Sequence, residues 1–307
     1  MVNIWKIWKI ARKGKQMKLF KKTKNRTTGH TVYRFLGIKL SIKNKTLRLE
    51  KEIASLRKIL NATIDITKYP KADGELRNIQ IECTNLLKSF DKICKENNLE
   101  YWLDSGTLLG AYRHKGFIPW DDDIDTCMLR EDYIKVLPIL KKYFENSDFY
   151  VRERAITVNN FQIRIINKNN SKIALDIFPV DAYIKSNLSD EEKKEVTGKI
   201  KKATKIFHKK YHSKRLKAEK IPKAKRDLLA IQNKIVLEDR LPQEDKPALF
   251  FAIDFPCDAK GDLVFDHDLV FPLKAIEFEG NTYPCPNRTE DYLSNFYGNY
   301  MEFPKTI

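Results

Sequence analysis

Apolar residues follow a helical period through the first part of the main body of the chain. From Leu76 to Cys94 they fall on one face at spacings of three and four, and Asn97 and Asn98 end the pattern. A second helix is predicted from Glu131 to about Phe144, although Pro138 lies in its middle. The inward positions of the first helix are Leu76, Ile79, Cys83, Leu86, Leu87, Phe90, Ile93 and Cys94.

Short apolar runs rich in β-branched and aromatic residues alternate with these helices. They predict strands at 101–103, 124–129, 149–151, 161–166 and 173–180. Helices and strands in this order argue for a single mixed sheet flanked by helices, of the α+β or α/β class. We therefore expect an α+β fold.

An amphipathic stretch precedes this body. Leu49, Ile53, Leu56 and Leu60 are spaced four, three and four residues apart, which predicts a short helix with a heptad-like stripe. We favour packing of this stripe on the chain's own domain; a helical hairpin and a weak dimer seam are the alternatives. Pro70 and the segment 71–75 then mark a boundary.

Charge divides the chain further. The net charge is +17, but residues 1–60 alone carry +16 and residues 199–226 carry +12, so the rest is acidic. We expect a basic extension over 1–70, a catalytic core over 71–184, a charged helical insert over 185–262 and a returning C-terminal part over 263–307.

The first 22 residues combine tryptophan with lysine. Ile4, Trp8 and Ala11 recur at helical spacing with Trp5 beside them, and Lys or Arg fills the positions between. This predicts a basic amphipathic helix lying on an anionic membrane surface. A basic leader without a specific partner is the alternative, while nucleic acid is disfavoured because no recognised binding motif accompanies the charge.

Composition restricts the compartment. No apolar run approaches the roughly 18 residues of a membrane span, and no secretory leader is recognisable. The five cysteines are scattered without a C-x-x-C pair, which favours a reducing environment. We expect a cytoplasmic protein that is peripheral on the inner face of the membrane.

The chemistry is concentrated between residues 104 and 125. Asp123 and Asp125 are two residues apart, so in a strand their side chains project to the same side. Two such carboxylates repel each other unless a cation lies between them, and Mg²⁺ prefers carboxylate oxygens. Asp176 similarly interrupts an apolar strand.

Small residues upstream predict a phosphate site. Ser105, Gly106 and Thr107 stand at a strand-to-helix turn, where backbone N–H groups can approach a phosphate. Arg113, His114 and Lys115 add positive charge before the acidic strand. Acidic runs and Gly-Thr turns are also common in solvated loops; the combination, and the cost of burying unpaired carboxylates, favours a site.

The stretch GTLLGAYRHKGFIPWDDDIDTCMLREDY (106–133) resembles the LicD family, which includes bacterial phosphocholine transferases and is related to fukutin. LDIFPVD (175–181) and the segment 278–304 resemble further family signatures. In the last of these an acidic residue is expected after Tyr297-Gly298, and this chain has Asn299. The family looks like a branch of the polymerase-β-type nucleotidyltransferases.

The resemblance implies an enzyme that moves a phospho-alcohol, by analogy phosphocholine from CDP-choline, to a sugar hydroxyl of a cell-surface glycan or its lipid-linked precursor, with release of CMP. It implies Mg²⁺ or Mn²⁺ held by the three aspartates, and a polar set around the donor phosphates. The metal ligands are Asp123, Asp125 and Asp176; the phosphate set is Ser105, Gly106, Thr107, Arg113, Lys115 and Arg164; flanking rings that could cage choline are Trp102, Trp120 and Tyr112.

Two other functions remain open from the sequence. A nucleotidyltransferase that attaches a nucleotide to a small molecule, protein or RNA would use the same Asp-x-Asp chemistry and release pyrophosphate. A non-catalytic protein binding membranes or polyanions is disfavoured by the three intact carboxylates.

Overall fold

A computed structural model gives the structure of the chain. It describes residues 20–25, 30–35, 38–43, 45–155, 161–183, 185–210, 223–224, 226–227, 230, 246–251 and 263–303. The chain divides into two compact units, one of residues 1–65 with 303–307 and the other of residues 66–302. Within the described residues, no helix has both the length and the apolar character needed to cross a membrane.

The smaller unit contains a sheet that the sequence did not predict. Strands β1 (Phe20–Asn25), β2 (His30–Phe35) and β3 (Ile38–Lys43) form an antiparallel meander. It is followed by α2 (Lys45–Thr63), which confirms the helix predicted from the heptad-like spacing. Of the predicted membrane-binding segment, residues 1–19 lie outside the described part of the chain, and residues 20–22 belong to β1.

The larger unit is built on a seven-stranded mixed sheet, so the α+β prediction is confirmed. Its central strands are β5 (Ile124–Leu129) and β8 (Ala174–Ala182), which pair in parallel. Strand β4 (Trp102–Leu103) adds antiparallel to β5. The strands predicted from the apolar runs are all present, with β6 (Phe149–Ala155) and β7 (Phe161–Asn167) forming a hairpin.

Two strands, β7 and β9 (Leu249–Phe251), pair with different parts of the same edge of β8. The first half of β8 pairs with β7, and its last residues pair with β9, which in turn pairs with β10 (Val264–Phe265). The other edge of β8 carries β5. Residues in the first half of β8 therefore lie between two neighbouring strands, at the centre of the sheet.

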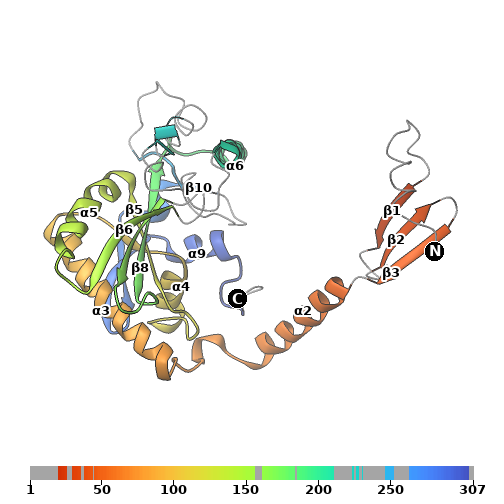
Figure 1. Ribbon diagram of the computed structural model, residues 1–307, viewed down its shortest axis with the longest axis horizontal. Helices are drawn as coiled ribbons and strands as arrows, with labels where there is room; N and C mark the ends of the chain where they lie inside the picture. Colours follow the sequence, from red (N-terminus) through yellow and green to blue (C-terminus); the bar gives the residue numbers. More distant parts are fainter. Residues whose placement is uncertain are drawn as a thin grey trace. The chain divides into compact units, whose positions relative to one another are not determined.

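Helices cover both faces of this sheet. In Figure 1, α3 (Gly74–Glu96) and α5 (Arg130–Tyr143) lie on one side, and α4 (Ser105–His114) and α9 (Thr289–Tyr297) lie on the other. The predicted inward face of α3 is buried from Ile79 to Cys94, and α5 accommodates Pro138 on its exposed side.

The remaining elements are short or belong to the predicted insert. The hairpin of β11 (Lys274–Phe278) and β12 (Asn281–Cys285) forms a separate two-stranded sheet. The short helices are η1 (Ile66–Lys68) and α8 (His267–Val270). In the insert, α6 (Asp190–Lys210) begins with three acidic residues, which suit the positive end of a helix dipole.

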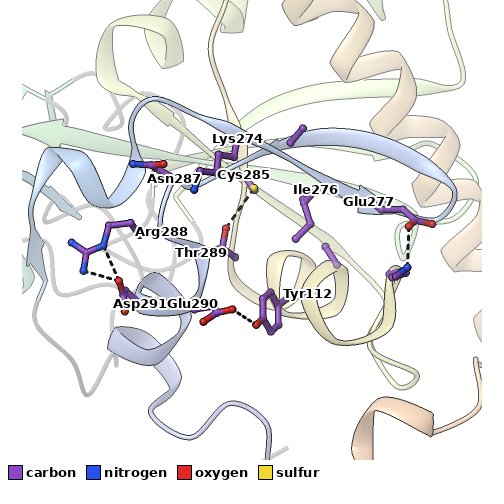
Figure 2. Close-up of a pocket in the computed structure, with 13 residues that line it drawn as sticks. Tyr112, Lys274, Ile276, Glu277, Cys285, Asn287, Arg288, Thr289, Glu290 and Asp291 are labelled. Atoms are coloured by element: carbon purple, nitrogen blue, oxygen red, sulfur yellow. Dashed lines mark hydrogen bonds and ion pairs between the residues drawn. The ribbon is translucent and has the colours of Figure 1, made fainter.

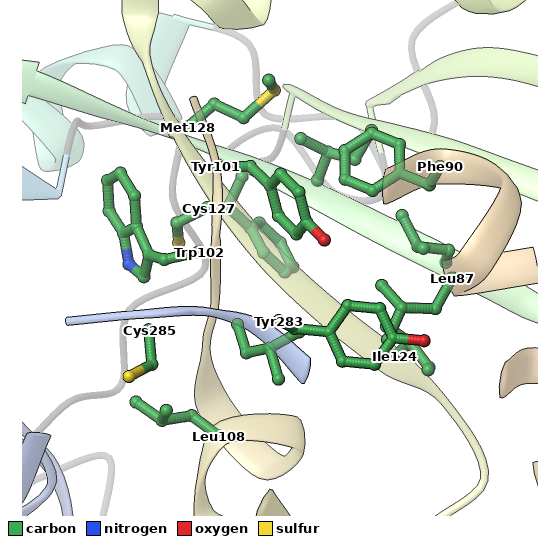
Figure 3. Packing of buried hydrophobic residues seen from close by; sticks show 14 of the residues in the cluster. Leu87, Phe90, Tyr101, Trp102, Leu108, Ile124, Cys127, Met128, Tyr283 and Cys285 are labelled. Carbon is green, nitrogen blue, oxygen red and sulfur yellow. The ribbon is translucent and has the colours of Figure 1, made fainter. Parts of the chain in front are cut away.

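The core joins segments far apart in the sequence. Figure 3 shows Leu87 and Phe90 of α3, Trp102 of β4, Ile124 of β5 and Tyr283 of β12 packed together. Because side chains from β12 complete this cluster, the C-terminal part is integral to the fold that holds the central strands in place.

Candidate active site

Three aspartates converge where β5 and β8 run side by side. Asp125 and Asp176 are register partners on these parallel strands, and Asp123 immediately precedes β5. One carboxylate oxygen from each of the three lies within 4.8 Å of the others. The strand pairing thus brings together residues about fifty positions apart and forms the set predicted from the sequence.

The electrostatics of this group favour a cation. Burial, together with the charges of Asp123 and Asp176, raises the pKa of Asp125 well above its ordinary value. Burial and the neighbouring Asp122 likewise raise the pKa of Asp123, against the opposing effect of Arg164. These shifts reflect how strongly burial and the neighbouring carboxylates oppose ionisation of each carboxyl group. An all-oxygen donor set of this kind is what hard divalent cations prefer, so the residues fit a metal ion of that class.

A cationic side chain, Arg164, lies beside the cluster. It lies opposite Asp176 in the antiparallel pair of β7 and β8, with its Nε 3.2 Å from Asp176 Oδ1. Its charge also favours the ionised form of Asp123. The structure therefore brings Arg164 to the same place as the carboxylates.

A second acidic group adjoins the first through Asp123. Carboxylate oxygens of Asp121, Asp122 and Asp123 also lie within 4.8 Å of one another. Burial and the charge of Asp123 raise the pKa of Asp121 to about 7. The side chain of Asp121 rests against Gly106, where a Cβ atom would stand 2.5 Å from Asp121 Oδ2. Gly106 thus provides room for this carboxylate.

The start of α4 holds the acidic strand in position. The backbone N–H of Asp125 donates to Thr107 Oγ1 (2.9 Å), and its carbonyl accepts from the backbone N–H of Asp104 (3.1 Å). Ser105 has a φ of 47°, in the left-handed region that is uncommon for residues other than glycine. Such strain at the first residue of a helix is frequent at functional sites.

Two tyrosines of α9 reach this region and were not assigned a role from the sequence. The Tyr292 hydroxyl donates to Asp104 Oδ1 (2.6 Å) inside the core. Burial and the charges of Asp104 and Asp125 raise the pKa of Tyr297, although the residue is 45% exposed. Both lie in the C-terminal segment 278–304 that resembles a family signature. A tyrosine has no sequence pattern that would predict a position beside an acidic site.

The basic residues predicted beside Asp123 lie at the far end of α4. Arg113 is buried and donates to the Tyr300 carbonyl (2.9 Å). Lys115 caps the helix in the left-handed conformation and pairs with Glu277 (3.5 Å). A helix of ten residues separates these positions from Ser105 by roughly 14 Å. The contacts that position Arg113 and Lys115 are therefore to Tyr300 and Glu277.

The expectation that His114 adds positive charge is corrected. Burial, and secondarily the charge of Arg113, lowers the pKa of His114 to about 4. The imidazole is therefore neutral at neutral pH.

The three rings considered for a choline cage have different surroundings. Trp102 is 0% exposed and packs edge-to-face on Phe271, so it offers no face to a ligand. Trp120 is partly buried against the core and meets the Tyr69 ring at 5.8 Å. Tyr112 donates its hydroxyl to Glu290 (2.6 Å).

Tyr112 and Lys115 line a separate groove of about 580 Å³. It lies between the end of α4, the β11–β12 hairpin and the start of α9, and Figure 2 shows its mixed charges, including Lys274, Glu277 and Arg288. The described residues that line it include none of the clustered aspartates.

Asn299, which stands where the resemblance leads one to expect an acid, donates to Glu302 (2.7 Å) and is exposed.

Comparison with known proteins places this geometry in context. Residues 98–216 match the family model described as the LicD/FKTN/FKRP nucleotidyltransferase domain. The chain is 29% identical over 257 residues to the lipopolysaccharide cholinephosphotransferase LicD of Haemophilus influenzae, covering 75% of this chain and 92% of that protein. It is 36% identical over 111 residues to the uncharacterized protein RP689 of Rickettsia prowazekii, covering 35% of this chain and 42% of that protein. A shorter match, 53% over 34 residues, covers 11% of this chain and 7% of the human ribitol 5-phosphate transferase FKRP.

Proposed function

Because the chain carries a nucleotidyltransferase domain of the LicD family, as its sequence predicts, we propose that it is a phosphotransferase acting on a CDP-linked alcohol. The transferred group in this proposal is phosphocholine, and the acceptor is a sugar hydroxyl of a cell-surface glycan or its lipid-linked precursor. The acceptor oxygen forms a bond to the phosphorus that bears choline, the bond from that phosphorus to the CMP oxygen breaks, and the hydroxyl proton is released.

The observation that carries this proposal is the convergence of Asp123, Asp125 and Asp176 on adjacent parallel strands. We assign these three carboxylates as the ligands of Mg²⁺ or Mn²⁺. When bound, such a cation orients the donor phosphates and offsets the charge that develops on them.

The remaining residues suit a donor with two phosphates. Backbone N–H groups at the start of α4, at Ser105 and Gly106, lie at the positive end of the helix dipole and attract an anion. Arg164 adds a fixed cation beside Asp176. Thr107 acts through Asp125, whose backbone it holds.

The test combines purified protein, Mg²⁺ and a panel of CDP-alcohols, with CMP release and donor-dependent thermal stabilisation as readouts. We expect one donor to stabilise the wild-type protein and to yield CMP when a glycan acceptor is added. Asp123→Ala should abolish turnover while leaving the fold intact. Pyrophosphate release from a nucleoside triphosphate, without CMP release from any CDP-alcohol, would replace this proposal with nucleotide transfer.

We also propose that residues 1–22 hold the enzyme on an anionic membrane surface beside its acceptor. The support is the alternation of tryptophan with lysine and arginine in this segment. Co-sedimentation with anionic liposomes, comparing the full chain with a form lacking residues 1–22, measures the effect. Equal binding of the two forms would end this part of the proposal.

A further inference from the structure

An apolar stripe runs along α2 and is open to solvent. The exposed fractions are 57% for Ile53, 60% for Leu56, 58% for Ile59 and 39% for Leu60. Most helix stability in proteins comes from burying such a stripe, and a contiguous exposed patch of large apolar residues marks an interaction surface. The sequence favoured packing of this stripe on the chain's own domain and left a weak dimer seam as an alternative.

The stripe has the spacing of a coiled-coil seam. With Ile53 and Leu60 at the a positions of a heptad, Leu49 and Leu56 occupy the d positions. This repeat of 3.5 residues keeps the stripe turned toward a partner helix over its whole length. Ile53 at a lies between Leu49 and Leu56 at d, and isoleucine at a with leucine at d is the combination that favours two parallel strands.

The flanking charges identify the partner as a second copy. In a parallel pair, each g position faces the e position five residues further along the other helix. Glu52 is at g and Arg57 is at e, so each copy offers the charge that the other requires. By sequence, Lys45 and Glu50 repeat this relation one heptad earlier.

The last g–e pair is apolar and extends the seam. It consists of Ile59 and of Ile64, which directly follows the last residue of α2 and whose backbone N–H donates to the Leu60 carbonyl (2.8 Å); they are 58% and 38% exposed. In an antiparallel pair g faces g and e faces e, so Glu52 and Arg57 would no longer meet. The complementarity is therefore specific to a parallel, in-register homodimer.

We propose that α2 forms a parallel two-stranded coiled coil with α2 of a second copy of this chain. Within the same unit, the Phe303 backbone N–H donates to Asn61 Oδ1 of α2 (2.9 Å), at position b outside the seam. The proposal is independent of the catalytic activity.

Analytical ultracentrifugation of the full chain tests it with a matched pair of variants. Leu56→Asp places a charge in the seam, and Ser55→Asp makes the same charge change at exposed position c. We expect the wild type and Ser55→Asp to be dimers, and Leu56→Asp to self-associate at least about a hundredfold more weakly, since two buried leucines are lost per dimer. Unchanged melting temperatures would show that the larger unit remains folded.

Charge reversal tests the parallel arrangement. Glu52→Arg or Arg57→Glu alone should weaken self-association by about tenfold, because attraction becomes repulsion twice per dimer. The double variant Glu52→Arg/Arg57→Glu should recover wild-type association. Wild-type protein that is monomeric at every concentration, or equal association of Leu56→Asp and Ser55→Asp, would overturn the proposal; a double variant that stays weak would overturn the parallel pairing.

Discussion

Gly106→Ala is expected to damage the active site without damaging the fold. The added Cβ would stand 2.5 Å from Asp121 Oδ2, and ordinary van der Waals contact begins near 3.4 Å, so the carboxylate must move by about 0.9 Å. Asp121 is a short, half-buried side chain grouped with Asp123, so this movement is transmitted to the predicted metal ligands. Displacements of about 1 Å in a catalytic arrangement cost on the order of a hundredfold in rate.

The melting temperature should change little, because the higher helix propensity of alanine offsets the cost of displacing Asp121. Gly106 lies within α4, and alanine is favoured over glycine in a helix by about 0.8–1 kcal/mol. Gly198→Ala in α6 is the matched control, because a Cβ there would meet nothing within 4 Å. It should gain about 0.8–1 kcal/mol in the free energy of unfolding and keep full activity.

The assay measures melting temperature, CMP release and Mn²⁺ affinity for the two variants side by side. We expect a tenfold to hundredfold lower kcat/KM and weaker metal binding for Gly106→Ala only. If the two variants have the same activity and the same metal affinity, the close approach of Asp121 to Gly106 has no role in the site, and the reasoning is refuted.

Three further perturbations have defined outcomes. Asp125→Asn should reduce turnover by roughly a thousandfold or more. It should keep or raise the melting temperature, because it removes one of several buried carboxyl groups that repel one another when ionised. Retained CMP release would exclude Asp125 as an essential ligand. Tyr292→Phe should lower the free energy of unfolding, measured with urea, by about 1–3 kcal/mol, because it removes the buried hydrogen-bond donor to Asp104; an unchanged value would show that this bond is not stabilising. Burial opposes ionisation of Glu279, but the hydrogen bond from Arg77 lowers the pKa of Glu279 below its ordinary 4.5. The contribution of Glu279 to stability is therefore present above pH 4.5 and is lost as the pH falls through its folded-state pKa. The free energy of unfolding of Arg77→Met should depend less on pH in this acid range than that of the wild type. Identical pH profiles of the two proteins would contradict this prediction.

Local pattern was sufficient for the helices and strands of the larger unit from α3 to β8, whereas the strands β9 to β12 and the helix α9 were not predicted. The apolar period of α3 and the runs that became β5 and β8 are properties of neighbouring residues, and burial on one face is enough to select helix or strand. The three strands of residues 20–43 escaped prediction, because lysines and other polar residues interrupt them and their antiparallel partners supply what the local pattern lacks.

The candidate site shows the same division. Asp123 and Asp125 could be identified from the sequence because unpaired carboxylates are costly in an apolar strand, and this cost is visible locally. Only the tertiary structure could set Asp125 beside Asp176, place Arg164 on the next strand and bring Tyr292 and Tyr297 to Asp104. It also placed Arg113 and Lys115 at the far end of α4, although they are near the aspartates in sequence. The physical reason is that strand register and helix direction depend on which distant segments pack together, and no spacing along a single segment encodes that choice.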